Sequence, residues 1–179
     1  MTGAAEAYAQ GLYSLAAQEN LSKTILDELL VLEQAFSQEP KYLRLLTMPN
    51  IPKQERCEIL DRDFRGNIQP YLLNFLKILV EKGYISQFPK CCRAYHAQYN
   101  LDNGILPVKV TTAVALQPEQ AQRLQAKLEK LTGKTVELTN VCDPQCLGGI
   151  RLDYDGKRMD ATVQNRLAQV SDLLKNTVL

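Results

Sequence analysis

The chain has 179 residues, of which 45% are hydrophobic and 23% charged, and its formal net charge is +1. This length suits one or two domains with a real core, and the near-neutral charge argues against nucleic acid or an anionic membrane as a partner. Apolar runs stay shorter than the ~20 residues of a membrane span, and the N-terminal MTGAAEAYAQ resembles neither a signal nor a transit peptide, so we expect a cytosolic protein without direct membrane insertion.

The first predicted helix covers residues 4 to about 19. Its apolar residues recur at helical spacing and predict one buried stripe, made of Tyr8, Leu12, Leu15 and Ala16. Gly11 lies inside this helix, where glycine costs about 1 kcal/mol relative to alanine. Two readings of Gly11 stay open: another helix packs closely against that face, or the position is simply tolerated.

Three further helices follow. Asn20 to Ser22 marks a break and precedes a helix whose predicted buried stripe is Ile25, Leu29, Leu32 and Phe36. Pro40 and Pro52 are each placed to open a helix, because the missing N–H of proline is unused in the first turn. The helix after Pro52 runs to about Phe64.

Pro70 precedes the most apolar helix of the chain, in which the apolar residues from Tyr71 to Val80 point all round the axis. Such a helix is either central to a bundle or has one face covered by a partner. Lys82-Gly83 ends it, and a sixth helix follows with Ser86 as its expected cap and Phe88, Cys92, Tyr95 and Tyr99 on one face. Residues 1 to 104 are therefore predicted to form a six-helix bundle.

The pattern changes at Ile105. A strand is predicted over residues 106 to 115, a helix from Gln117 to Gly133, a second strand over 135 to 138, and a hairpin around Asp155-Gly156, the dipeptide that two-residue turns favour. Gly148-Gly149 lets the backbone bend or approach a neighbour closely. A last amphipathic helix is predicted over residues 163 to 174. Residues 105–179 thus form a β-α-β-β-α module, and the fold class is α+β, mainly α.

We find no constellation that supports catalysis, a metal or another cofactor. The five cysteines are an odd number, and small buried hydrophobes are the favoured reading of them. Cys142-x-x-x-Cys146 could be half a zinc site, but His96 is the only histidine and four ligands are hard to assemble. A basic group formed by Arg151, Lys157, Arg158 and Arg166 is by default a solvated hairpin edge, with an acidic helical partner as the alternative.

Four segments, in order along the chain, carry a resemblance to a known family. They are Tyr8-Ala9-Gln10-Gly11-Leu12, Asn74-Phe75-Leu76-Lys77-Ile78-Leu79, Leu131-Thr132-Gly133-Lys134, and a C-terminal run of Gly148-Gly149 and then Asp160 to Leu167. Together they resemble the delta subunit of F-type ATP synthase, known in mitochondria as the oligomycin-sensitivity-conferring protein. The chain departs from that pattern at Tyr84, where a basic residue is usual, and at Ala161-Thr162 and Gln164-Asn165.

The resemblance implies a non-catalytic stator component, present in one copy on the catalytic head of a proton- or sodium-translocating ATP synthase. Its helical domain would bind the N-terminal segment of an α subunit, and its C-terminal module the ends of the two b subunits. It would be peripheral, on the cytoplasmic side of a bacterial plasma membrane. No nucleic acid is implied.

On this basis we assign candidate binding residues. The expected α-subunit groove comprises Tyr8, Gly11, Leu12, Leu15, Leu76, Ile78 and Leu79, although for Leu12 and Leu76 a place in the core is the favoured reading. The expected stalk-binding residues are Gly148, Gly149, Asp160, Arg166 and Leu167. The alternative functions are a free-standing helical adaptor for another amphipathic peptide and a cysteine-dependent redox or metal protein.

Overall fold

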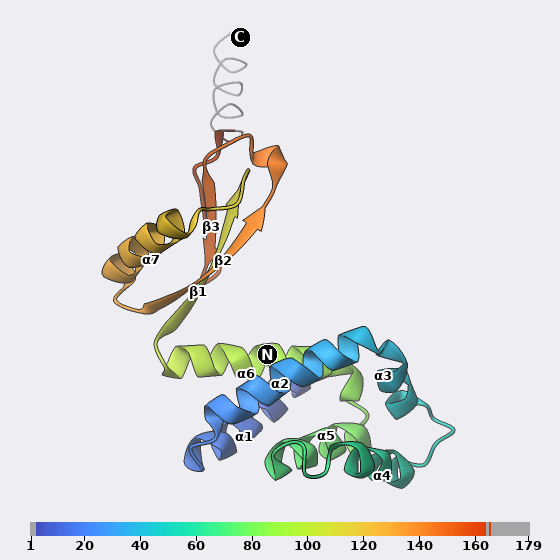
Figure 1. Cartoon of the computed structure of the whole chain (residues 1–179). Coiled ribbons are helices and arrows are strands. Elements are labelled where there is room, and N and C mark those ends of the chain that lie inside the picture. Colours follow the sequence, from blue (N-terminus) through green and yellow to red (C-terminus); the bar gives the residue numbers. More distant parts are fainter. Residues whose placement is uncertain (1–2, 164, 166–179) are drawn as a thin grey trace, which may run out of the picture. The chain divides into compact units, whose positions relative to one another are not determined.

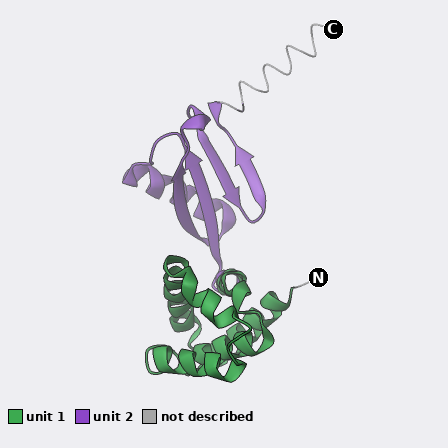
Figure 2. Ribbon diagram, turned by 90° about the vertical axis from the view of Figure 1, so that its right-hand side faces the viewer, with its two compact units in different colours: residues 1–99 green, residues 100–179 purple. Residues whose placement is uncertain are grey.

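A computed structural model describes residues 3–163 and residue 165. The chain divides into two compact units, Met1–Tyr99 and Asn100–Leu179 (Figure 2). The sequence placed the boundary near residues 103 to 106, and the units divide slightly earlier, inside the sixth helix. The predicted fold class is confirmed, because a six-helix region precedes a four-stranded sheet with one helix.

The first unit is helical (Figure 1). Its elements are α1 (Ala4–Gln18), α2 (Ser22–Gln38), α3 (Pro40–Thr47), α4 (Lys53–Phe64), α5 (Pro70–Lys82), the 3₁₀ turn η1 (Ile85–Gln87) and α6 (Phe88–Asp102). Pro40 and Pro70 are the first residues of their helices, as their missing N–H favours. Ser86 does not cap the sixth helix as expected, since it lies within η1 and α6 begins at Phe88.

The core of this unit confirms the stripe predicted for α2, since Ile25, Leu29, Leu32 and Phe36 are all buried. Phe36 is packed edge-on against Phe88, with ring centroids 5.2 Å apart.

The buried face of α1 differs from the predicted stripe. It consists of Ala5, Ala9, Leu12, Tyr13 and Ala16, whereas Tyr8 is half-buried and Leu15 is exposed. Alanines make up most of this face, and the buried Tyr13 lies edge-on to Tyr95, with ring centroids 5.2 Å apart. Tyr8 and Leu15 are thereby left on the flank of the helix.

In its described residues, the second unit is a mixed sheet with one helix. Its elements are β1 (Ile105–Thr112), α7 (Pro118–Thr132), β2 (Thr135–Cys142), the 3₁₀ turn η2 (Pro144–Cys146), β3 (Ile150–Tyr154) and β4 (Lys157–Asp160). The strand order is β2-β1-β3-β4. β1 and β2 are parallel and joined through α7, while β3 is antiparallel to both β1 and β4.

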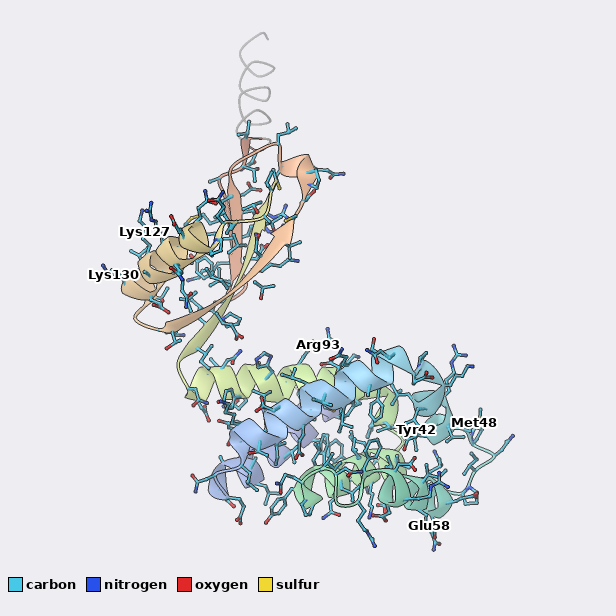
Figure 3. The ribbon with its side chains drawn as sticks, in the orientation of Figure 1. Tyr42, Met48, Glu58, Arg93, Lys127 and Lys130 are labelled. Atoms are coloured by element: carbon cyan, nitrogen blue, oxygen red, sulfur yellow. The ribbon has the colours of Figure 1, made fainter. Side chains whose placement is uncertain are left out.

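Helix α7 covers one face of this sheet. Leu124 and Leu128 pack against a small core of Leu106, Val108, Val110, Val136 and Leu152, and Lys127 and Lys130 lie on the outer side of the helix (Figure 3). The hairpin is confirmed, because Asp155 and Gly156 have the positive φ values, +48° and +70°, that its turn requires. β2 runs to Cys142 rather than ending at residue 138, since its last four residues pair with Lys109–Thr112 of β1.

The predicted last helix lies outside the described residues except for Val163 and Asn165. Within the described part of the chain, no helix has both the length and the apolar character needed to cross a membrane.

Candidate partner-binding surfaces

An apolar groove of about 320 Å³ runs between α1 and α5. Each helix contributes a row of side chains at helical spacing, so that both rows follow the groove. The lining residues are Ala7, Tyr8, Gly11, Leu12 and Leu15 from α1 and Tyr71, Asn74, Phe75 and Ile78 from α5. Leu15 and Ile78 leave 47% and 41% of their surface exposed, which is a high fraction for large apolar side chains in contact with a groove.

The structure brings together five of the seven residues assigned to this groove from the sequence: Tyr8, Gly11, Leu12, Leu15 and Ile78. Leu76 and Leu79 do not line it, because both are fully buried in the helical core. Sequence reasoning missed Ala7, Tyr71, Asn74 and Phe75. The spacing of Tyr71, Asn74, Phe75 and Ile78 on one face of α5 is the signal that could have found most of them.

Gly11 lies in this groove without a close neighbour. A Cβ atom built on Gly11 would meet no other atom within 4 Å. Among the described residues, no neighbouring helix packs so closely on Gly11 that it would exclude a side chain, so close packing does not explain the glycine. The space above it opens to the groove.

Tyr8 is paired with a second aromatic ring at the groove. The rings of Tyr8 and Tyr84 have centroids 5.9 Å apart and are tilted by 45°. Tyr84 follows Gly83, whose left-handed backbone (φ +77°) ends α5. Tyr84, one of the positions at which the sequence departs from the family pattern, thus packs on Tyr8 of the groove.

In the second unit, Gly148 and Gly149 lie against the segment that follows β4. A Cβ at Gly149 would lie 2.5 Å from the carbonyl oxygen of Ala161 and 2.9 Å from Cα of Thr162, and the φ of Gly149 is +83°. The carbonyl of Gly148 accepts a hydrogen bond from the Val163 N–H at 3.0 Å. The close approach expected from the Gly-Gly pair is confirmed.

Asp160 also holds this segment, through local hydrogen bonds. Its carboxylate accepts hydrogen bonds from the backbone N–H of Thr162 at 3.0 Å and from its hydroxyl at 2.7 Å. The hydroxyl oxygen in turn accepts from the Asn165 N–H at 3.2 Å, as an N-cap does. These bonds to Thr162, together with the nearby Arg151 and Arg158, lower the pKa of Asp160.

Asp160 and the two glycines therefore set how the chain leaves the sheet. Thr162, which the sequence showed only as a departure from the family pattern, belongs to the same arrangement, and its position just before Val163 is a recognisable cap signal. Arg166 and Leu167, the remaining predicted stalk-binding residues, lie outside the described residues.

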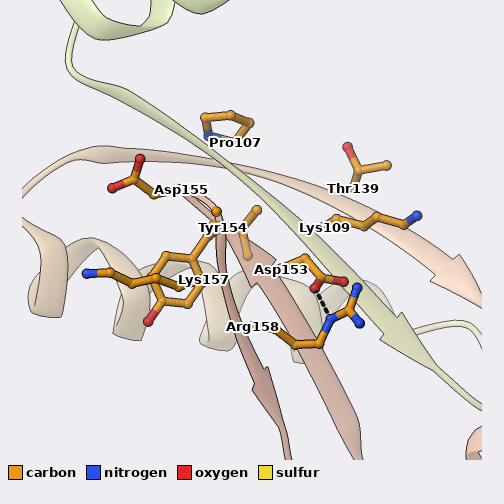
Figure 4. Close-up of a pocket in the computed structure, with 10 residues that line it drawn as sticks. Pro107, Lys109, Thr139, Asp153, Tyr154, Asp155, Lys157 and Arg158 are labelled. Carbon is orange, nitrogen blue, oxygen red and sulfur yellow. Dashed lines mark hydrogen bonds and ion pairs between the residues drawn. The ribbon is translucent and has the colours of Figure 1, made fainter.

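A polar depression of about 660 Å³ lies beside the β3–β4 hairpin. Lys109, Thr139, Asp153 and Arg158 line part of it (Figure 4), and Arg158 Nε lies 2.6 Å from the Asp153 carboxylate. Arg151 Nε is 3.8 Å from the same carboxylate. Because Asp153 offsets part of the local positive charge, these contacts fit a solvated hairpin edge better than a site for an acidic partner.

The structure has the five cysteines as free thiols, of which Cys91, Cys92 and Cys146 are buried as expected, whereas Cys142 is exposed. Burial raises the pKa of Cys91 to about 11 and also raises that of Cys92, so both thiols stay protonated and unreactive at neutral pH. Among the described residues, no three His, Cys, Asp or Glu side chains are grouped so as to hold a metal ion.

Comparison with known proteins gives consistent matches along the chain. The family model described as "ATP synthase delta (OSCP) subunit" matches residues 4–174. The ATP synthase subunit delta of Latilactobacillus sakei is 33% identical, with 93% of each chain covered, and that of Alkaliphilus oremlandii is 29% identical, with 96% of each covered. A chain of the mitochondrial ATP synthase of Toxoplasma gondii has the same fold, with a TM-score of 0.76, 18% identity and coverage of 96% of this chain and 97% of that one.

These matches define a subunit of an F-type ATP synthase. Within that class, the chain belongs to the ATP synthase delta (OSCP) subunit family, and it is a non-catalytic structural subunit and a component of the stator. The free-standing adaptor and the redox or metal protein are therefore set aside.

Proposed function

We propose that this chain joins the catalytic head to the peripheral stalk by binding a different partner with each unit. The helical unit takes the N-terminal segment of an α subunit in the α1–α5 groove, and the second unit binds the ends of the b subunits. One copy serves each complex, on the cytoplasmic side of a bacterial plasma membrane. The observation that carries the proposal is the open apolar groove.

The dimensions of the groove support a helical occupant. The row from Tyr8 to Leu15 and the row from Tyr71 to Ile78 each rise about 10 Å, or two helical turns. An amphipathic helix laid between them would bury an apolar stripe against both rows, which is the usual helix-in-groove arrangement. Asn74 gives the lining an amide that can hydrogen-bond to such a helix.

Exposed apolar side chains support a second contact surface at the end of the sheet where β1 and β2 finish. Val114, Leu147 and Val163 are all exposed there, and Leu147 is 69% exposed although its φ is +58°. Covering a large apolar side chain that is mostly exposed to water is favourable, so these side chains would contribute to the binding of a partner. This surface is continuous with the segment held by Gly148 and Asp160, which the resemblance assigned to the stalk.

The groove is tested by Ile78→Asp. A carboxylate in the middle of an apolar contact would lose its hydration on binding, so we expect the affinity for a peptide of the α-subunit N-terminal segment to fall at least tenfold. Titration calorimetry with the full chain measures it. Because Ile78 is 41% exposed, the variant should stay folded, with a circular dichroism spectrum and a melting temperature close to those of the unchanged protein.

Val31→Asp is the matched control, because Val31 is a large apolar residue that is 66% exposed on α2 and does not line the groove. It should leave the peptide affinity unchanged. Equal affinity for the unchanged protein and for Ile78→Asp would place the α segment elsewhere, and absence of binding by the unchanged protein would refute the proposed partner.

A further inference from the structure

Tyr8 projects from a part of α1 that offers its ring little lateral support. On a helix, a side chain is flanked by the residues three and four positions away. For Tyr8 these are Ala4 and Ala5 on one side and Gly11 and Leu12 on the other, and only Leu12 is large. The ring is part of the groove wall and packs on one side against the helical core, so its support comes from residues outside its own stretch of α1.

Tyr84 is placed to supply that support. Its ring lies 5.9 Å from the ring of Tyr8, centroid to centroid, at a tilt of 45°, within the range of favourable aromatic pairs. Tyr84 does not itself line the groove. It therefore contacts Tyr8 without belonging to the surface that a helix in the groove would cover.

The backbone of Tyr84 is fixed on both sides. Its N–H donates to the carbonyl of Leu79 at 2.7 Å, and its own carbonyl accepts from the Gln87 N–H at 2.8 Å. The next residue, Ile85, is buried in the core. Tyr84 is thus anchored at the end of α5, while Tyr8 stands on α1.

We propose that Tyr84 is a positioning residue that fixes the ring of Tyr8 as one wall of the groove before the partner helix arrives. The inference rests on the proposed function, in which the groove receives the α-subunit segment. Holding the ring in its bound orientation removes an ordering cost from binding. Aromatic pairs of this kind correspond to about a two- to tenfold change in an equilibrium constant, so this is the expected contribution of Tyr84 to affinity.

The test is a double-mutant cycle on the full chain, with a peptide of the α-subunit N-terminal segment as the probe. Tyr84→Leu should weaken binding about two- to tenfold, and Tyr84→Phe, which keeps the ring, should bind as the unchanged protein does. In a Tyr8→Leu background, Tyr84→Leu should cause no further loss, because the ring that it supports is gone. Denaturant unfolding of each variant shows whether stability changes along with affinity.

A second measurement does not need the partner. Nuclear magnetic resonance couplings of the Tyr8 side chain should report one χ1 rotamer in the unchanged protein and in Tyr84→Phe, and averaging among rotamers in Tyr84→Leu. Equal losses of affinity in both backgrounds, or one fixed Tyr8 rotamer in Tyr84→Leu, would overturn the inference. If the unchanged protein does not bind the peptide, the proposed partner fails, while the rotamer measurement still decides whether Tyr84 positions Tyr8.

Discussion

Single backbone positions decide how the last described segment joins the sheet. Gly149 combines a left-handed φ with a contact so close that a side chain has no room. Hydrogen bonds from Thr162 to the Asp160 carboxylate then fix the same segment locally. Residues that the resemblance assigned to partner binding therefore have a structural role in the chain itself.

Gly149→Ala should destabilise the second unit by about 2–4 kcal/mol, because it adds a strained φ and an overlap with Ala161 and Thr162. Hydrogen exchange of the β1 and β3 amides measures this loss. Gly156→Ala is the matched control, since Gly156 also has a positive φ (+70°) but a Cβ there would meet nothing within 4 Å. It should cost only about 1 kcal/mol, and equal losses for the two variants would contradict the steric argument.

At the scale of elements, α1 shows a conflict between stability and an open surface. Its buried face is built from alanines with Leu12 and Tyr13, while Gly11 occupies an interior helical position where a Cβ would meet no atom within 4 Å. A glycine in that setting weakens the helix. The helix tolerates this glycine, although an alanine at position 11 would stabilise it more.

Gly11→Ala should therefore raise the free energy of unfolding by about 0.5–1 kcal/mol, because it improves helix propensity and meets no neighbouring atom. Urea denaturation followed by circular dichroism checks it. The same substitution at Gly66 should have the opposite sign, since the φ of Gly66 is +87°. A destabilised Gly11→Ala would mean that the groove closes over this position in solution.

The elements themselves could be predicted from the sequence because their periodicity and their proline and glycine boundaries agree. The α2 stripe and the Asp155-Gly156 hairpin are examples. The buried face of α1 could not, because Tyr8 and Leu15 fit a helical stripe as well as Ala5 and Ala9 do, and only the approach of neighbouring helices decides between them. For the same reason the sequence assigns Leu79 to the groove, whereas the core place favoured for Leu76 agrees with its burial: an evenly apolar helix does not reveal which of its faces is covered.

At the scale of the molecule, the two units have separate hydrophobic cores. One cluster lies within the helical unit, and the other joins the sheet to α7. A unit with its own core is able to fold alone. Two separate fragments can therefore test whether each unit binds its own partner.

We expect fragments 1–104 and 105–179 each to fold, with a helical and a mixed circular dichroism spectrum respectively. Fragment 1–104 should bind the α-subunit peptide with the affinity of the full chain, and fragment 105–179 should bind the C-terminal part of a b subunit. Pull-downs with the fragments exchanged between the two partners are the control. Binding of either partner only by the intact chain would show that the two functions are not divided between the units.

The strand order of the second unit has a mechanical consequence. Because β3 is antiparallel to both β1 and β4, the chain enters at Ile105 and leaves β4 at Asp160 from opposite ends of the sheet. Tension between these two points runs along the strands and meets ladder hydrogen bonds that lie across it. The hydrogen bonds are then loaded in shear and share the force, instead of breaking one after another. A stator component that is pulled from both ends needs this kind of resistance.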